Sequence, residues 1–198
     1  MDNRDEALKK IKDEVISLST SPLFAYRTEN KYLPVIGEGN HFAEIMFVGE
    51  APGKNEALTG KPFCGRAGKI LDELLISIGI DRKDVYVTNI VKDRPPENRD
   101  PLPEEIEAYG PFLDRQIEII APKVIATLGR FSMQYVMSRF GLEWELSSIS
   151  DIHGKVFDAE PNGTKIKVIP LYHPAATIYN QHLLGTLKED FQVLKTLI

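Results

Sequence analysis

A loop rich in glycine and proline, which begins Gly49-Glu50-Ala51-Pro52-Gly53, carries the first residues that could do chemistry. Glycine lets a ligand approach the main chain closely, and a helix that starts after such a loop directs backbone N–H groups outward. The loop therefore suits an anion or a flat ligand. It lacks the Gly-Lys-Ser/Thr ending of a P-loop and the Gly-x-Gly-x-x-Gly pattern of a dinucleotide site. Taken alone, it is best interpreted as a tight turn.

Two further polar clusters follow apolar runs later in the chain. One spans 89–99 and opens with Asn89, and the other spans 172–176 and contains His173. An amide both donates and accepts hydrogen bonds, and a neutral imidazole offers one donor and one acceptor. Alone, Asn89 is typical of a turn cap at a strand end, and His173 of a core or helix-start residue before proline. Their combination with the first loop is what points to a binding site.

The elements that must position these clusters alternate between strands and helices. Strands are predicted at 43–48, 84–91 and 123–128, and a hairpin at 155–158 and 165–170 around Pro161-Asn162-Gly163. Helices are predicted at 5–18, 67–78, 103–120, 131–140 and 184–197, with a kink or break at Pro111. Residues 19–42 are expected to form an extended surface loop, and residues 141–152 are expected to be irregular.

This alternation predicts an α/β fold, a three-layer α/β/α sandwich with a mainly parallel, four-stranded central sheet. In such sheets ligands bind beyond the carboxyl ends of the strands, which is where all three polar clusters fall. The chain shows no repeat and no linker composition, so residues 1–198 are expected to form a single domain.

Composition narrows the class of protein. The chain has 198 residues, of which 42% are hydrophobic, and its net charge is −5. One cysteine, Cys64, permits neither an internal disulfide framework nor an all-cysteine metal site within one chain. No apolar run has the length of a membrane span and the charged N-terminus has no signal-peptide core, so we expect an intracellular protein. The negative net charge excludes an overall basic surface but leaves room for a local basic patch around the first loop.

Taken in chain order, the motifs resemble those of the uracil-DNA glycosylase superfamily, in particular its family-four branch. Each motif is weak alone, and together, from about residue 35 to the C-terminus, they are specific. The matching stretches are Gly49-Glu50-Ala51-Pro52-Gly53, Gly60-Lys61-Pro62-Phe63, Gly65-Arg66-Ala67-Gly68, Thr88-Asn89-Ile90-Val91-Lys92, Arg94-Pro95-Pro96-Glu97-Asn98-Arg99 and His173-Pro174-Ala175-Ala176. The resemblance implies a DNA-repair enzyme that flips uracil out of DNA and hydrolyses its N-glycosidic bond, leaving an abasic site.

The resemblance also assigns roles in binding the flipped uracil and in cleaving its bond to the sugar. His173 would donate to uracil O2 as a neutral imidazole, and the Asn89 amide would pair with uracil O4 and N3–H. Phe63 would stack on the flipped base, and Gly49 would lie against it. Glu50 is the carboxylate best suited to orient the attacking water, since Ala51 stands where other branches carry an Asp.

Other residues would act at the edge of the pocket or on the DNA. Glu56 resembles a family glutamate that helps exclude the thymine methyl, although a solvated loop acid is an equal alternative. Backbone N–H groups of the loops would hold phosphates together with nearby cations. Tyr179 belongs to a loop, 177–183, placed to wedge into the duplex, and the wedge residue itself is left open. The cations are Lys61, Arg66, Lys92, Arg94 and Arg99.

The chain departs from the family pattern in one major respect. Family-four members resemble iron–sulfur proteins with four cysteine ligands, and the corresponding positions here are Pro22, Ala25, Asp93 and Tyr109. One thiol cannot replace four soft thiolates. We therefore expect no cofactor and no metal, and we expect packing to replace the cluster. Residues suited to that packing are Phe24, Tyr26 and Tyr109.

Three functions stay open at this stage: removal of uracil, removal of another deaminated base such as hypoxanthine, and DNA binding or damage sensing without catalysis. Ala57 and His153, which replace a family Asp and Arg, leave the substrate range open. We expect uracil-containing DNA, single- or double-stranded, as partner and uracil as product. We also expect a monomer with no membrane contact, in the cytoplasm with the nucleoid.

Overall fold

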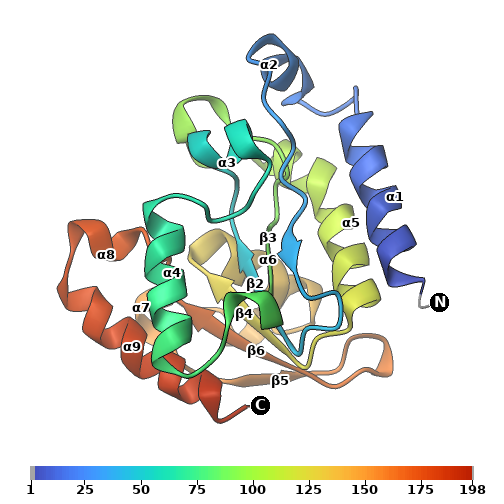
Figure 1. The fold of residues 1–198 in the computed structure, drawn as a ribbon. Helices are drawn as coiled ribbons and strands as arrows, with labels where there is room; N and C mark the ends of the chain where they lie inside the picture. The colour runs from blue at the N-terminus through green and yellow to red at the C-terminus, as the bar shows by residue number, and fades with distance from the viewer. Residues whose placement is uncertain (1–2, 198) are drawn as a thin grey trace.

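The computed structural model describes residues 3–197 and has a six-stranded central sheet between helices (Figure 1). The strand order is β1-β3-β2-β4-β6-β5. The four inner strands are parallel, while β1 and β5 add antiparallel edges. The predicted parallel core and the predicted hairpin β5–β6 are confirmed. The sheet has six strands where four were predicted, because β1 and β5 extend it at its two edges. The strands are β1 (Glu38–Gly39), β2 (Ile45–Gly49), β3 (Tyr86–Asn89), β4 (Val124–Leu128), β5 (Phe157–Ala159) and β6 (Ile166–Leu171).

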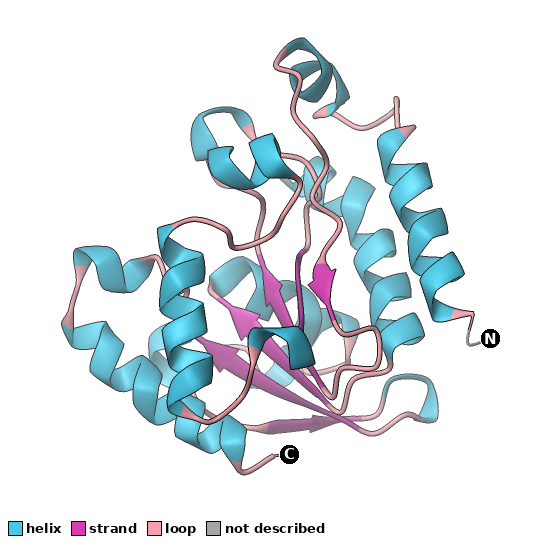
Figure 2. Cartoon of the chain, in the orientation of Figure 1, coloured by secondary structure: helices cyan, strands magenta, loops and turns pink. Residues whose placement is uncertain are grey.

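Helices cover both faces of this sheet, as the magenta strands between cyan helices in Figure 2 show. The inner strands are apolar at nearly every position because neither face meets water. Met46 and Val48 of β2 point to one layer, and Ile45 and Phe47 point to the other. The first layer comprises α1 (Arg4–Ile16), α5 (Pro103–Ile120) and α6 (Arg130–Arg139), and the second α4 (Arg66–Ser77) and α9 (His182–Lys195).

Short elements fill the segments expected to be irregular. Residues 19–42 contain a helix and the edge strand β1, so the expected extended loop was wrong there. Among the described residues, no helix combines the length and the apolarity needed to cross a membrane. The short helices are α2 (Phe24–Glu29), α3 (Lys54–Thr59), α7 (Ile149–Ile152) and α8 (Ala176–Tyr179), with 3₁₀ turns η1 (Arg82–Asp84), η2 (Pro96–Asn98), η3 (Glu143–Glu145) and η4 (Pro161–Gly163).

Helix α5 continues through Pro111, where the sequence predicted a kink or a break. Proline removes one backbone hydrogen bond and crowds the preceding turn. Pro111 itself is exposed, whereas its neighbours Tyr109, Phe112 and Leu113 are buried in the first layer. Tertiary packing of this face therefore outweighs the local cost of the proline.

Candidate active site

The carboxyl ends of the parallel strands bring the three polar clusters to one edge of the sheet. Gly49, the last residue of β2, is in register with Asn89, the last residue of β3. Strand β6 ends at Leu171, two residues before His173. Gly129 directly follows β4, and a Cβ built there would lie 3.3 Å from the Cβ of His173. The sheet topology therefore assembles the site that the sequence predicted at this edge.

Four of the residues expected to bind uracil form a contiguous row: Gly49, Asn89, Phe63 and His173. A Cβ at Gly49 would lie 2.3 Å from Asn89 Oδ1 and 2.8 Å from Phe63 Cζ, so a larger residue there would displace both side chains. The rings of Phe63 and His173 stack with their centroids 5.5 Å apart. Amide, aromatic ring and imidazole therefore line one wall, in the arrangement needed to hold a flat heterocycle with polar edges.

The protonation of His173 follows from its contacts. Its Nδ1 lies 3.1 Å from the backbone N–H of Ala175, and a backbone N–H can only donate, so Nδ1 is an acceptor. The ring proton is then on Nε2, which becomes the free donor. Burial lowers the pKa of His173 from 6.5 to about 4, because desolvation disfavours the imidazolium. The site therefore holds a neutral imidazole that can donate a hydrogen bond at neutral pH.

The backbone of Phe63 is held in an uncommon conformation. Its φ is 48°, in the left-handed region. A Cβ at Gly68 would lie 1.7 Å from the Phe63 carbonyl oxygen, so only glycine allows α4 to approach so closely. The Arg82 guanidinium donates to the carbonyls of Pro62 at 2.8 Å and Phe63 at 3.3 Å. Sequence reasoning missed Arg82, because a charged residue in a surface turn carries no local signal of a partner about 20 residues away.

Glu50 follows Gly49 at the same edge and is partly buried. The pKa of its carboxyl is raised from 4.5 to about 7, mainly by desolvation and also by the nearby Asp100 carboxylate, while Arg130 opposes both. Asp100 and Arg130 form an ion pair with each other. A carboxyl group that titrates near neutrality can accept a proton from water, which is the property required of a general base.

A rising pH–rate profile is the expected consequence for catalysis. If the Glu50 carboxylate accepts from the attacking water, kcat/KM should rise about tenfold per pH unit up to the pKa and level off above it. That pKa is about 7. His173 stays neutral throughout, because its pKa is about 4. Steady-state kinetics from pH 5 to pH 9 on the unmodified protein and Glu50→Gln test this. Identical profiles for the two proteins would contradict a role for Glu50 as base.

Glu56 closes the loop that carries Phe63. Its Oε1 accepts from the Gly65 N–H at 3.3 Å, and a Cβ at Gly53 would lie 2.7 Å from its Oε2. The carboxylate thus spans the loop from one glycine to the other. This position ties the two ends of the loop together, and a direct contact with the base stays a prediction.

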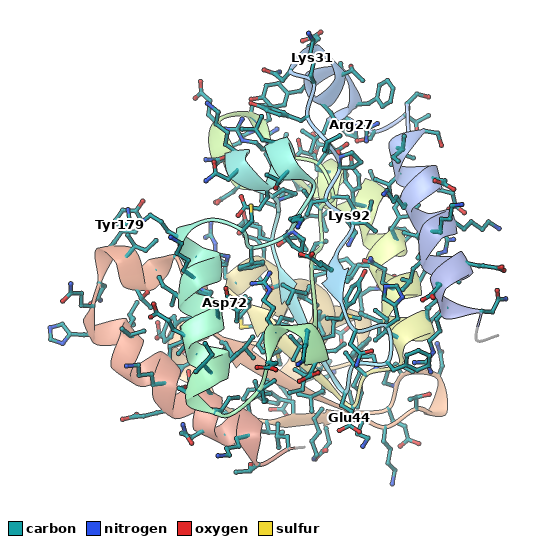
Figure 3. The ribbon with its side chains drawn as sticks, in the orientation of Figure 1. Arg27, Lys31, Glu44, Asp72, Lys92 and Tyr179 are labelled. Atoms are coloured by element: carbon teal, nitrogen blue, oxygen red, sulfur yellow. The ribbon has the colours of Figure 1, made fainter. Side chains whose placement is uncertain are left out.

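The cations expected on the DNA side fall into two groups. Lys61 and Arg66 are exposed on the loop and at the start of α4. Lys92 is fully buried, and Figure 3 shows it inside the molecule, so its expected place on the DNA-binding surface is corrected. Arg94 is 9% exposed and donates to Asn98 Oδ1 and to the hydroxyls of two tyrosines, which removes it from that surface as well.

Arg99 and Tyr179 are the two remaining residues that were predicted to contact DNA. Arg99 donates to both oxygens of the buried Glu105 carboxylate, at 2.6 and 2.9 Å, so its guanidinium is occupied although it is partly exposed. Tyr179 is 91% exposed at the end of α8 and lies at the edge of the molecule (Figure 3). Its placement leaves the ring available to a partner.

A polar network occupies the region where the family resemblance implies cluster ligands. Tyr109 donates to Asp93 Oδ2 at 2.5 Å and contacts Ser21 Oγ at 2.6 Å. The Arg27 guanidinium lies 3.0 Å from the same carboxylate oxygen and also donates to the carbonyls of Val15 and Ile16. These groups saturate one another, and none is a thiolate. In residues 3–197, no group of three or more His, Cys, Asp or Glu side chains is arranged to hold a metal ion.

The residues present therefore do not fit an iron–sulfur cluster. Tyr109 is packed in the core as expected, and hydrogen bonds are added to this packing. Of the other two residues expected there, Tyr26 accepts from Arg94, and Phe24 lies beneath the Arg27 guanidinium. The network joins α1 and α2 to the segment after β3 and to α5. It thus ties the N-terminal part of the chain to the segment that follows Asn89.

Replacement of Tyr109 by phenylalanine is expected to destabilise the fold by about 1.5–3 kcal/mol, because a buried carboxylate loses a hydrogen bond. The thermal midpoint should fall by roughly 2–4 °C per kcal/mol, which calorimetry can measure. The control is Tyr179→Phe, at an exposed site, with an expected change near zero. An iron chelator should leave the midpoint of the unmodified protein unchanged. A midpoint lowered by the chelator, or equal midpoints for Tyr109→Phe and its control, would contradict this structural role.

The fold and the row of site residues define a class of protein: an α/β enzyme whose sheet edge binds a flat nitrogenous base. Residues 36–195 match the sequence model described as the uracil DNA glycosylase superfamily. The chain belongs to this superfamily.

Individual relatives agree with that assignment. A "Type-4 uracil-DNA glycosylase" of Archaeoglobus fulgidus is 49% identical over 187 residues, which cover 94% of this chain and 91% of the relative. One of the same description from Thermotoga maritima is 42% identical over 200 aligned residues, covering 100% of this chain and 98% of the relative. A third, from Sulfurisphaera tokodaii, is 49% identical and covers 97% of this chain and 85% of the relative.

Proposed function

We propose that this protein removes uracil from DNA by hydrolysing the bond between uracil N1 and deoxyribose C1′. The observation that carries the proposal is the row of Asn89, Phe63 and His173, in which a neutral imidazole offers its Nε2 proton. The curated relatives named type-4 uracil-DNA glycosylases support it over nearly the whole chain.

Base recognition would use the wall of the site. The Asn89 amide donates to uracil O4 and accepts from N3–H, while cytosine presents the opposite pattern at both atoms. Phe63 stacks on the ring, a contact worth about 1–3 kcal/mol for each base. Gly49 lets the base approach both side chains, since any Cβ at that position would displace them.

Bond cleavage then separates charge. The electron pair of the breaking C1′–N1 bond stays with uracil, which leaves as an anion, and the sugar develops oxocarbenium character. The His173 Nε2–H donates to uracil O2 as charge accumulates there, and no proton need be transferred. A water molecule adds its oxygen to C1′ and loses a proton to Glu50. The uracil anion takes up a proton from solvent and Glu50 releases its own, so uracil and an abasic site are the products.

DNA would bind across the carboxyl edge of the sheet. Lys61 and Arg66 supply exposed positive charge close to Phe63. Tyr179 projects from α8, which begins three residues after His173, and is a candidate to occupy the space of the extruded nucleotide. Extrusion costs a few kcal/mol, and phosphate contacts offset this cost. We propose that a monomer acts on both single- and double-stranded DNA.

An oligonucleotide assay tests the function. The purified protein is incubated with end-labelled strands that contain one uracil, single-stranded or paired with G or A, and alkali then cuts abasic sites. We expect cleavage at uracil and none in matched strands with thymine or cytosine. Cleavage at hypoxanthine alone would favour the other deaminated base, and binding without cleavage would favour a damage-sensing protein. Either outcome would overturn the proposal.

A further inference from the structure

Lys92 is a fully buried lysine, and none of its three hydrogen-bond partners is a carboxylate. Its Nζ donates to the Asn89 carbonyl at 2.6 Å, to Thr88 Oγ1 at 2.8 Å and to Gln116 Oε1 at 2.6 Å. An ammonium group has three donors and no acceptor, so these partners satisfy it completely. Burial of a cation is nonetheless costly, and an apolar side chain would fill the space at lower cost. The residue therefore calls for an explanation beyond packing.

The backbone of Asn89 supplies this explanation. Gly49 of β2 accepts from the Ile90 N–H at 3.0 Å, and alternation along a strand turns the Asn89 carbonyl toward the opposite side of β3. Strand β1 lies on that side, but its pairing with β3 is limited to Tyr86 and Val87. A buried carbonyl beyond the end of the ladder needs another donor. Lys92 provides it and fixes the peptide from which the Asn89 side chain projects.

The other two acceptors are themselves oriented. Thr88 Oγ1 donates its proton to the Ile36 carbonyl at 2.6 Å. Gln116 Nε2 donates to the same carbonyl at 2.9 Å and lies 3.1 Å from the Tyr86 hydroxyl. Their protons are committed elsewhere, so both present lone pairs to Lys92. The Lys92 amine thus links the end of β3 to α5 through Thr88 and Gln116, whose orientations are fixed by their other hydrogen bonds.

We propose that Lys92 is a positioning residue for base recognition: it holds the main chain of Asn89 so that the amide meets uracil in one orientation. This inference rests on the proposed function. It assigns Lys92 to the reaction from inside the protein, in place of the phosphate contact expected from its sequence motif. Misplacement of a reacting group by about 1 Å can cost roughly 100-fold in rate, which sets the scale of the effect.

Lys92→Met tests the proposal, because it keeps an unbranched side chain, only one atom shorter, and removes every donor. Single-turnover excision of uracil is expected to slow by about 10- to 100-fold. DNA affinity and its dependence on salt should stay unchanged, since no phosphate contact is lost. Lys92→Gln should recover part of the rate, because an amide N–H can still donate to the Asn89 carbonyl. Tyr135→Phe is the control: it removes a hydrogen bond to Asp114, at a partly buried position outside this cluster, and should retain the full rate.

A double-mutant cycle separates positioning from a structural role. In the Asn89→Ala background, Lys92→Met should slow the reaction little further, because the side chain it positions is gone. If Lys92→Met does not fold, the cycle is measured with Lys92→Gln. Independent, multiplying losses would overturn the proposal, as would a rate for Lys92→Met equal to that of Tyr135→Phe. Failure of the unmodified protein to cleave uracil-containing DNA would instead refute the proposed function.

Discussion

Replacement of His173 by alanine is expected to slow single-turnover excision of uracil by roughly 10²–10³-fold, equivalent to about 2.7–4 kcal/mol of barrier. The Nε2–H of His173 is free to donate because Nδ1 already accepts from Ala175. Charge on uracil O2 grows as the glycosidic bond breaks, so the hydrogen bond is stronger in the transition state than in the bound substrate. The rate should therefore fall far more than the affinity for uracil-containing DNA.

The control for this variant is His41→Ala, which removes a partly exposed histidine that pairs with Asp5 outside the site. It should cleave at the unmodified rate. The pH dependence gives a second readout. Because the pKa of His173 is about 4, the unmodified protein should show no loss of rate between pH 7 and pH 6 beyond that of Glu50. A folded His173→Ala protein as fast as the unmodified one would refute the role of this donor.

The sequence was sufficient to predict the parts of the site that follow from sheet topology. Asn89 and His173 each follow an apolar run, and parallel strands place their carboxyl ends at one edge. Gly49 follows from the same rule, and the structure brings all three together with Phe63. The parallel core was predictable for a related reason: strands buried on both faces consist almost entirely of apolar residues.

Other features depend on contacts between distant segments, which local patterns do not encode. Lys92 stands beside Asp93 and Arg94 and has the appearance of a surface cation, yet its backbone carbonyl accepts from Val35 and its side chain reaches α5. The hydrogen bond from Arg82 to the Phe63 carbonyl likewise joins segments that lie apart in the sequence. Strand β1 is two residues long, too short for a period to be recognised. Burial and charge pairing set these positions, and they become visible only in three dimensions.

The resemblance to the family predicted the network at Tyr109 only in part. The absence of cluster cysteines follows directly from the sequence. Packing of aromatic side chains was the expected replacement. Tyr109 is indeed packed in the core, and the structure adds to this packing a carboxylate, a guanidinium and two hydroxyls that satisfy one another. Four polar positions spread from residue 21 to residue 109 have no shared periodicity, so their convergence could not be predicted from spacing.

Substitution of Asn89 is expected to change both rate and base preference. Asn89→Ala removes the donor to uracil O4 and the acceptor for N3–H, and should slow uracil excision by about 10³-fold, since one such donor is worth 10²–10³. At a pH where its carboxyl is ionised, Asn89→Asp should be at least as slow with uracil, because a carboxylate repels O4 where the amide donated.

The aspartate variant should also gain slow excision of cytosine. A carboxyl oxygen can accept from the cytosine amino group, and burial raises the pKa of a carboxyl, so its protonated form can donate to cytosine N3. This activity should increase as the pH falls, because only the protonated form pairs with both atoms. Single-turnover cleavage of matched uracil and cytosine oligonucleotides from pH 5 to pH 8 measures both effects, and Asn162→Asp, an exposed change in the turn between β5 and β6, is the control. Uracil excision by a folded Asn89→Ala protein at the unmodified rate would refute the recognition scheme. If Asn89→Asp loses uracil excision and shows no cytosine cleavage at low pH, the amide orients the base by shape. The hydrogen-bond pattern alone would have admitted cytosine.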